Sequence, residues 1–450
     1  MLRIVHFADA HIDMANRGRH DPETGLPQRV LDFLKALDTI VDAAIREKVD
    51  LVMFAGDAYR DRTPAPTFQR EWDKRMMRLS AAGIPTLLLV GNHDLSPAAG
   101  RAHALHEFET LQIPHLHVLG RPAMLGPAQL EGLPLQVLAL PWVSRSAYMA
   151  TLQLSGLDPE EVYQQLEQAL VNIVNEWLEK CDPDLPTVML AHASVQGAIY
   201  GGERSVMLGK DIVLPASLVR DPRLDYVALG HIHKAQNLNQ GGYPPVIYPG
   251  SIERVDFGEA HDDKYFSMVF LEKQKTKWEW RRIEGRKFID KSLRLRTIED
   301  LRLPDPPPPL PVIPPDPIAA EQALPTPEQF LARLMAELPP PEEFKDAIMR
   351  LVVEYPREWD ALLDDGPLRR YAEPAFDFHL VRRPQMQARM RLPEDQGVSS
   401  LSPMELLNQY WKTIYTDPPD LRDINRLAED IITSTSQWTE EGSVDVWDER

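Results

Sequence analysis

Five short apolar runs in this chain each end in residues that can bind a metal ion. The clearest is residues 84–90, which is typical of a buried strand and is followed by Gly91, Asn92, His93 and Asp94. The glycine lets the backbone turn sharply where the strand ends. Because ligands of open α/β sheets usually bind at the carboxyl ends of strands, this tetrad predicts a binding site there. Taken alone, it is equally typical of a polar turn.

The other four runs repeat this arrangement. Asp, Asn and His side chains supply the oxygen and nitrogen ligands that divalent metal ions take in proteins. Because the tips of parallel strands meet at one edge of a sheet, we expect the seven side chains to converge in one site. Residues 2–8 lead to Asp9 and His11, residues 50–55 to Asp57, residues 187–191 to His192, and residues 224–229 to His231 and His233.

The order of these motifs resembles the calcineurin-like metallophosphoesterases. Their pattern is Asp-x-His, Gly-Asp, Gly-Asn-His-Asp or Gly-Asn-His-Glu, a lone His, and Gly-His-x-His, and all five parts are present here in that order. The resemblance implies a centre of two divalent metal ions with Asp57 as the bridge. It assigns Asp9, His11 and His233 to the first metal site. It assigns Asn92, His192 and His231 to the second.

The resemblance also implies roles for the two residues after Asn92. His93 faces the phosphate in that family and helps the leaving group, and it is not a metal ligand. Asp94 follows directly, and we expect it to hold the His93 ring by a hydrogen bond. The alternative for Asp94 is a simple turn residue.

A narrower resemblance comes from residues 228–233 and 248–259, which resemble the SbcD-type nuclease family over roughly residues 1–285. It implies a manganese-dependent exonuclease on duplex DNA ends and endonuclease on single strands. It also implies a homodimer bound to an SbcC-type ATPase in DNA repair. One departure is Arg60, where some members carry a histidine. Arg60 and Arg62 either contact phosphates or are solvated surface charges.

A length of 450 residues predicts two or three domains. Strands packed with helices over residues 1–285 predict an α/β fold, a two-sheet sandwich flanked by helices. Residues 286–395 are expected to form a small α+β capping domain, interrupted by a proline-rich loop at 304–327. Residues 436–450 are an acidic tail.

Residues 398–435 predict a helical hairpin with one apolar stripe on each helix. The stripes either dock on a partner, for which the resemblance names the ATPase, or pack on their own chain. The stripe residues expected to bind the partner are Leu407, Tyr410, Trp411, Ile414, Ile424, Leu427 and Ile431.

Composition narrows the function classes. The net charge of −19 is unusual for a protein that grips nucleic acid alone, although a local basic groove or a partner can supply the positive surface. The single cysteine, Cys181, excludes an intrachain disulfide and fits a reducing cytoplasm. No apolar run reaches membrane-spanning length, and the N-terminal run is too short for a signal peptide. We therefore expect a soluble cytoplasmic protein without a membrane partner.

Two other functions remain open from the residues alone. The first is a small-molecule or cyclic-nucleotide phosphodiesterase or phosphatase on the same metal core. The appended domain and hairpin argue against it, because a small substrate needs neither. The second is a non-catalytic scaffold that uses the fold only for binding, against which the complete ligand set and His93 argue.

Overall fold

The computed structural model describes residues 1–15, 18, 20–95, 102–143, 159–201, 213–302, 325–385, 404, 407 and 426–428. Two six-stranded sheets form the centre of the described chain. In the first, β1 to β4 run parallel in the order of the sequence, and β13 and β14 extend the β1 edge in antiparallel fashion. Its strands are β1 (Leu2–Phe7), β2 (Leu51–Phe54), β3 (Thr86–Leu89), β4 (Leu116–Leu119), β13 (Lys264–Leu271) and β14 (Lys277–Ile283).

The second sheet has the strand order β11-β12-β10-β7-β6-β5. Its four central strands are parallel, and the two edge strands, β5 and β11, are antiparallel to their neighbours. The strands are β5 (Ala123–Leu125), β6 (Gln136–Leu140), β7 (Thr187–His192), β10 (Tyr226–Gly230), β11 (Gln236–Asn237) and β12 (Val246–Tyr248).

The two sheets pack face to face, and helices cover their outer faces. Side chains alternate along β1: Ile4 is buried between the sheets, and Val5 is buried beneath the helices. Such strands are apolar on both faces, which explains the nearly continuous apolar runs of the sequence. The predicted α/β sandwich flanked by helices is confirmed.

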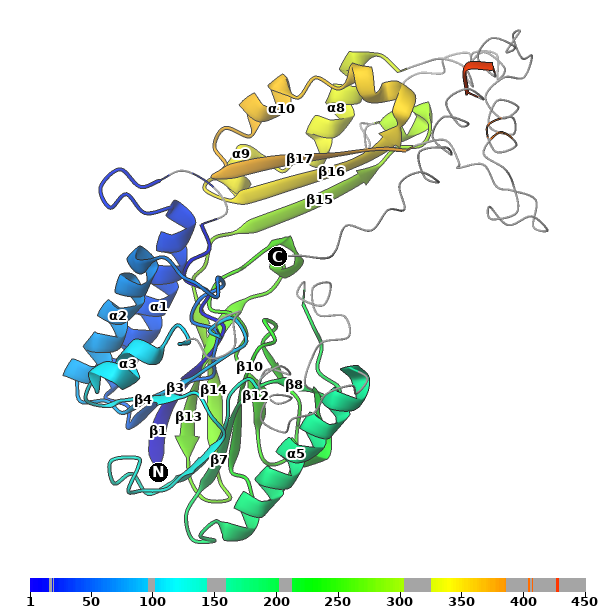
Figure 1. The fold of residues 1–450 in the computed structure, drawn as a ribbon. Helices are drawn as coiled ribbons and strands as arrows, with labels where there is room; N and C mark the ends of the chain where they lie inside the picture. The colour runs from blue at the N-terminus through cyan, green and yellow to red at the C-terminus, as the bar shows by residue number, and fades with distance from the viewer. Residues whose placement is uncertain are drawn as a thin grey trace, which may run out of the picture. The chain divides into compact units, whose positions relative to one another are not determined.

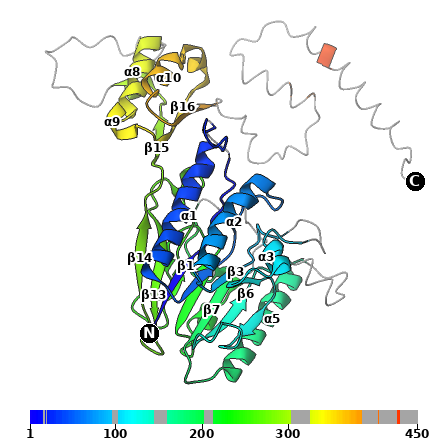
Figure 2. The ribbon, with the colours of Figure 1, turned by 90° about the vertical axis from the view of Figure 1, so that its left-hand side faces the viewer.

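The long helices are α1 (Gln28–Glu47), α2 (Pro66–Ala81) and α5 (Pro159–Lys180). Helices α1 and α2 lie side by side on the first sheet, and α5 covers the second sheet on the opposite side (Figures 1 and 2). The α1 residues Val30, Phe33 and Leu37 are spaced three and four apart, which puts them on one buried face. Shorter elements are α3 (His106–Leu111), α6 (Ala216–Val219), η2 (Phe257–Glu259), β8 (Ser194–Val195) and β9 (Val213–Leu214).

A third sheet has the order β15-β16-β17. Its strands and the neighbouring short helices together make the α+β composition expected after residue 285. The elements are β15 (Phe288–Arg294), η3 (Ile298–Leu301), α8 (Pro327–Glu337), α9 (Pro341–Phe344), β16 (Ile348–Pro356), η4 (Arg357–Leu362), α10 (Gly366–Tyr371) and β17 (Asp377–Gln385).

The chain divides into two compact units, and the division does not follow the expected boundary at residue 285. The first unit comprises Met1–Leu293, Leu331–Val352 and Asp364–Val381, and the second comprises Arg294–Phe330, Val353–Leu363 and Arg382–Arg450. The domain limits given above therefore stay predictions. The acidic tail and residues 304–324 of the proline-rich loop lie outside the described residues.

Candidate metal centre

The seven candidate ligands all lie at the carboxyl ends of parallel strands. Asp9 and His11 follow β1, Asp57 follows β2, and Asn92 follows β3 of the first sheet. His192 ends β7, and His231 and His233 follow β10 of the second. Because both sheets present these ends at the same place, the structure brings all seven side chains together.

The side chains form two neighbouring groups. Asp9, His11 and His233 offer ligand atoms within 4.8 Å of one another, and so do Asp57, His192 and His231. Asn92 completes the second group, because its Oδ1 lies 2.9 Å from both His192 Nε2 and His231 Nδ1.

Asp57 lies between the two groups. Its Oδ2 is 3.4 Å from His192 Nε2 in one group and 4.0 Å from His11 Nε2 in the other. Only 2% of the Asp57 side chain is exposed. A buried carboxylate with two oxygens in this position is suited to bridging two cations, which is the role predicted for it.

Hydrogen bonds at the far side of the rings show that the residues fit metal ions. His11 Nδ1 is 3.2 Å from the Tyr59 carbonyl oxygen, and His233 Nδ1 is 2.8 Å from Glu259 Oε1. When these nitrogens donate their protons, each ring keeps a lone pair on Nε2, and the two Nε2 atoms face each other at 3.1 Å. In this arrangement both rings would bind the same cation.

The second group has the same construction. His192 Nδ1 is 2.7 Å from the Ala55 carbonyl oxygen, so that Nε2 is the nitrogen directed at Asn92 and Asp57. Burial opposes a charge on His192, but the nearby Asp57 charge outweighs it and raises the His192 pKa to about 9. Burial likewise raises the pKa of Asp9 to about 7. Because metal ligands bind in their deprotonated form, metal binding at these residues would release protons.

The backbone is strained where it presents the ligands. Asp9, His11, Asp57 and His231 have φ values of 51°, 39°, 64° and 100°, in the region that residues other than glycine seldom occupy. Strained conformations of this kind persist where the surrounding structure enforces them, and they gather at functional sites.

Two glycines let the strands approach closely enough to form the site. A Cβ atom on Gly91 would lie 2.1 Å from Asp57 Oδ1, and a Cβ atom on Gly230 would lie 2.1 Å from the Ala55 carbonyl oxygen. These positions explain physically why Asn92 and His231 each follow a glycine.

Asp94 does not hold the His93 ring, in contrast to the sequence prediction. Its side chain is fully buried, and its oxygens accept the backbone N–H groups of Asp57, Ala58 and Gly91 at 2.9 Å each. The carboxylate therefore ties the β2 end to the β3 end. Three backbone donors satisfy both oxygens, whereas the His93 ring has another partner.

His93 lies at the edge of this centre. Its backbone N–H donates to Asp57 Oδ1 at 2.9 Å, and its ring meets the His11 ring edge-on with 5.3 Å between centroids. Its Nδ1 is 2.7 Å from the Arg60 carbonyl oxygen, so Nδ1 carries the proton and Nε2 is left for other contacts.

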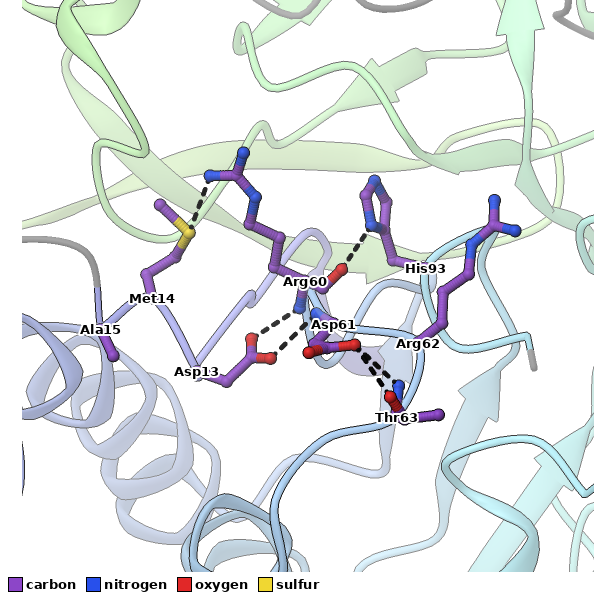
Figure 3. Close-up of a pocket in the computed structure, with 8 residues that line it drawn as sticks. All are labelled: Asp13, Met14, Ala15, Arg60, Asp61, Arg62, Thr63 and His93. Atoms are coloured by element: carbon purple, nitrogen blue, oxygen red, sulfur yellow. Dashed lines mark hydrogen bonds between the residues drawn. The ribbon is translucent and has the colours of Figure 1, made fainter. Parts of the chain in front are cut away.

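A hollow of about 770 Å³ opens beside His93 and is lined by Arg60 and Arg62, among others. The side chains of these three residues extend in the same direction (Figure 3). Asp13 holds the loop that carries Arg60 and Arg62. Its carboxylate accepts hydrogen bonds from the backbone N–H groups of Arg60 at 2.6 Å and Asp61 at 2.9 Å. The hollow therefore combines a histidine with two guanidinium groups next to the metal ligands.

Glu259 is a further residue of the centre that was not predicted from the sequence. This carboxylate is 1% exposed, accepts from Ser251 Oγ and Lys264 Nζ, and lies against His233 Nδ1. Burial opposes its charge, but Lys264 and His233 outweigh burial and hold the pKa of Glu259 well below its usual range. The signal was present, because Glu259 ends the 248–259 segment that resembles SbcD-type nucleases.

Little of the predicted partner surface falls within the described residues. Leu407 is helical and half-buried, and Leu427 is helical and 62% exposed. The other five stripe residues lie outside the described residues: Tyr410, Trp411, Ile414, Ile424 and Ile431. A docking role for this segment stays a prediction. Within the described chain, every helix is too short or too polar to cross a membrane.

Comparison with known proteins finds a family match that includes the whole metal centre. The model of the family described as calcineurin-like phosphoesterase matches residues 2–235, which contain all seven candidate ligands and His93. The chain is similar to the SbcD subunit of nuclease SbcCD from Escherichia coli strain K12, with 26% identity over 275 residues. It is also similar to the DNA double-strand break repair protein Mre11 of Archaeoglobus fulgidus, with 26% identity over 260 residues.

These matches leave part of each protein uncovered. The first covers 60% of this chain and 64% of the relative, and the second covers 58% and 52%. Among solved structures, a dimetal phosphatase from Danio rerio aligns with a TM-score of 0.37 and 13% identity, covering 63% of this chain and 96% of that one. A likeness this weak supports no conclusion about function.

Proposed function

The chain belongs to the calcineurin-like phosphoesterase family, and from this premise we propose that it is a metal-dependent DNA nuclease. It would cut duplex DNA from its ends and single strands internally, as the nuclease component of a cytoplasmic complex with an SbcC-type ATPase. The observation that carries the proposal is the joint presence of two ligand groups around Asp57 and a hollow lined by His93, Arg60 and Arg62.

The donor set suits two divalent ions of the manganese type. Asp9, His11 and His233 would hold one, Asn92, His192 and His231 the other, and Asp57 both. Carboxylate, amide and imidazole donors together are ligands that Mn²⁺ accepts. When bound, such ions neutralise charge on a phosphodiester and lower the pKa of water enough to provide a nucleophile near neutral pH.

The protein's own side chains supply the rest of the chemistry. His93, with Nδ1 fixed on the Arg60 carbonyl oxygen, would direct Nε2 at the phosphodiester. In its doubly protonated form it would give the Nε2 proton to the leaving oxygen and keep the proton on Nδ1. Arg60 and Arg62 would bind phosphates of the same strand on the side of the hollow. The buried carboxylate of Asp94 fixes the two strand ends on which Asp57 and Asn92 stand.

The two guanidinium groups of the hollow favour a substrate with more than one phosphate. Arg60 and Arg62 line the open space of about 770 Å³ beside His93. A strand of DNA carries further phosphates that these groups would bind, and an ester with a single phosphate does not. The names of the relatives also support DNA as the substrate, since one is part of a nuclease and the other is a double-strand break repair protein.

We further propose the assembly that the SbcD-type resemblance implies. The chain would form a homodimer, and the segment 398–435 would bind the ATPase. One relative is named as a component of SbcCD, and this supports a partner for this chain as well. A partner would also explain how a chain with a net charge of −19 binds DNA, because the ATPase can supply the basic surface.

A substrate panel tests the proposal. The purified chain is incubated with end-labelled duplex DNA, circular single-stranded DNA and a small nucleotide phosphodiester, each with Mn²⁺ and with a chelator. We expect Mn²⁺-dependent cleavage of both DNAs. Cleavage of the small diester alone would replace the nuclease with a small-molecule phosphodiesterase, and no cleavage of any substrate would leave the non-catalytic scaffold.

A further inference from the structure

A third cluster of metal-binding side chains lies outside the centre described above. His103, His106 and Glu109 offer ligand atoms that all lie within 4.8 Å of one another. The cluster belongs to the turn before α3 and to the exposed side of that helix. The catalytic proposal does not use any of its three residues.

The spacing of the residues creates the cluster. Histidine, histidine and glutamate recur every third residue, and positions three apart on a helical turn lie on the same face. The backbone N–H of His106 donates to the His103 carbonyl oxygen at 3.0 Å, which closes the turn between the two rings. Their centroids are 5.0 Å apart, with planes at 62°.

The three side chains differ in how exposed they are and therefore in how freely they can change rotamer. His103 is the anchored member: its Nδ1 is buried and has no hydrogen-bond partner in the described chain, and its Nε2 lies against Gly120. His106 and Glu109 are 47% and 60% exposed and can adjust their rotamers.

The distances leave room for that adjustment. His106 Nδ1 and Glu109 Oε2 are 3.7 Å apart. Two ligands about 2.0–2.1 Å from a tetrahedral zinc ion are about 3.3–3.4 Å from each other. A small rotation of two exposed side chains is therefore enough to bring His106 and Glu109 to this separation.

From these observations we propose that His103, His106 and Glu109 form a separate site for one borderline divalent cation, for which zinc is the best fit. Two imidazoles and one carboxylate are a ligand set that zinc takes with water in the fourth position. The ion would pin α3 to the preceding turn. That turn is joined to the metal centre, because the Ala104 backbone N–H donates to the Asp94 carbonyl oxygen at 2.9 Å.

Zinc counting on the untagged full-length chain tests this site independently of activity. Equilibrium dialysis against zinc, followed by elemental analysis, compares the unchanged chain with the double variant His106→Gln, Glu109→Gln. Both side chains are exposed, so the variant keeps its fold. We expect three zinc ions per chain in the first and two in the second. The catalytic pair accounts for two in both, whatever the reaction proves to be.

His117→Gln is the matched control. His115 and His117 also stand beside a glutamate, but their ring nitrogens already meet the two Glu131 oxygens at 2.7 Å each. We expect this variant to bind as many zinc ions as the unchanged chain. Equal zinc content in the double variant and the unchanged chain would overturn the proposal. So would a lost ion in the His117→Gln control.

Hydrogen exchange locates the ion. Zinc should slow amide exchange in residues 103–111 of the unchanged chain and leave the double variant unaffected. A one-ion difference without this local protection would put the ion elsewhere and would likewise overturn the proposal.

Discussion

At the scale of single residues, three histidines of the centre each depend on an oxygen behind the ring. His11, His192 and His233 are oriented by the Tyr59 carbonyl, the Ala55 carbonyl and the Glu259 carboxylate. Only the last of these partners is a side chain, so it is the one that a substitution can remove. Such partners orient the ring and raise its affinity for metal.

Glu259→Gln should therefore weaken metal binding roughly 10–100-fold. Glutamine keeps a hydrogen-bond acceptor for Lys264 and Ser251 but brings no negative charge to His233. Isothermal titration with Mn²⁺ measures the change. Glu279→Gln, at an exposed position of β14, is the control and should bind as the unchanged chain does. An unchanged affinity in Glu259→Gln would remove Glu259 from the site.

The bridging role of Asp57 is tested by comparison with a one-site ligand. Asp57→Ala should lose both metal ions, whereas His11→Ala should lose chiefly one, because the Asp57 carboxylate lies near histidine nitrogens of both groups. The two substitutions are matched in backbone strain, since φ is 64° at Asp57 and 39° at His11. Elemental analysis of the metal content decides, and an Asp57→Ala chain with two ions would rule out the bridge.

At the scale of strands and helices, the sequence predicted what depends on local pattern. The five apolar runs predicted β1, β2, β3, β7 and β10, and the polar residues after them predicted which side chains would meet. Asp94 shows where this reasoning stops. Its three partners are backbone groups contributed by two strand ends, and such contacts depend on register and leave no mark in the pattern of side chains.

The second limit concerns contacts across long separations. Asp13 was not predicted to support Arg60, because the two are 47 residues apart and the bond joins a side chain to a backbone N–H. The capping part showed the same limit: its mixture of helices and strands was predicted, but the division of the chain into compact units was not.

Strand β1 carries a buried histidine whose titration links stability to pH. His6 is fully buried, with Nδ1 3.0 Å from the Tyr226 hydroxyl oxygen. Burial lowers its pKa from 6.5 to about 3. The folded chain therefore keeps His6 neutral. The unfolded chain takes up a proton below its pKa of 6.5, so stability is full above that pH and falls as the pH drops towards 3.

At about pH 5 this group should cost about 2 kcal/mol of unfolding free energy relative to neutral pH. Urea unfolding of the unchanged chain and of His6→Gln at both pH values isolates the contribution, because all other groups are shared. The loss between the two pH values should be smaller by that amount in His6→Gln. Equal losses in both chains would show that His6 is not the group responsible.

At the scale of the whole molecule, the metal centre and the proposed partner segment are separate parts of the chain. All seven candidate ligands lie before residue 234. The predicted hairpin begins at residue 398. Two short amphipathic helices hide only part of their apolar stripes on each other, so the remainder favours a partner.

Truncation after Gly397 should abolish binding to the ATPase while leaving metal content unchanged. Co-purification of the two proteins measures the first effect, and elemental analysis measures the second. The double variant Leu407→Ala, Trp411→Ala should act like the truncation, because it removes two residues of one stripe. Full co-purification of the truncated chain would instead mean that the hairpin packs on its own chain.

We have proposed that this centre hydrolyses DNA and that His93 acts on the phosphodiester. The most direct measurement is the rate of duplex-end cleavage in Mn²⁺ by the unchanged chain and by His93→Gln, with metal content determined on the same samples. Equal metal content with a rate lower by about 10²–10⁴-fold in His93→Gln is the predicted result. An undiminished rate, or loss of metal together with activity, would contradict it.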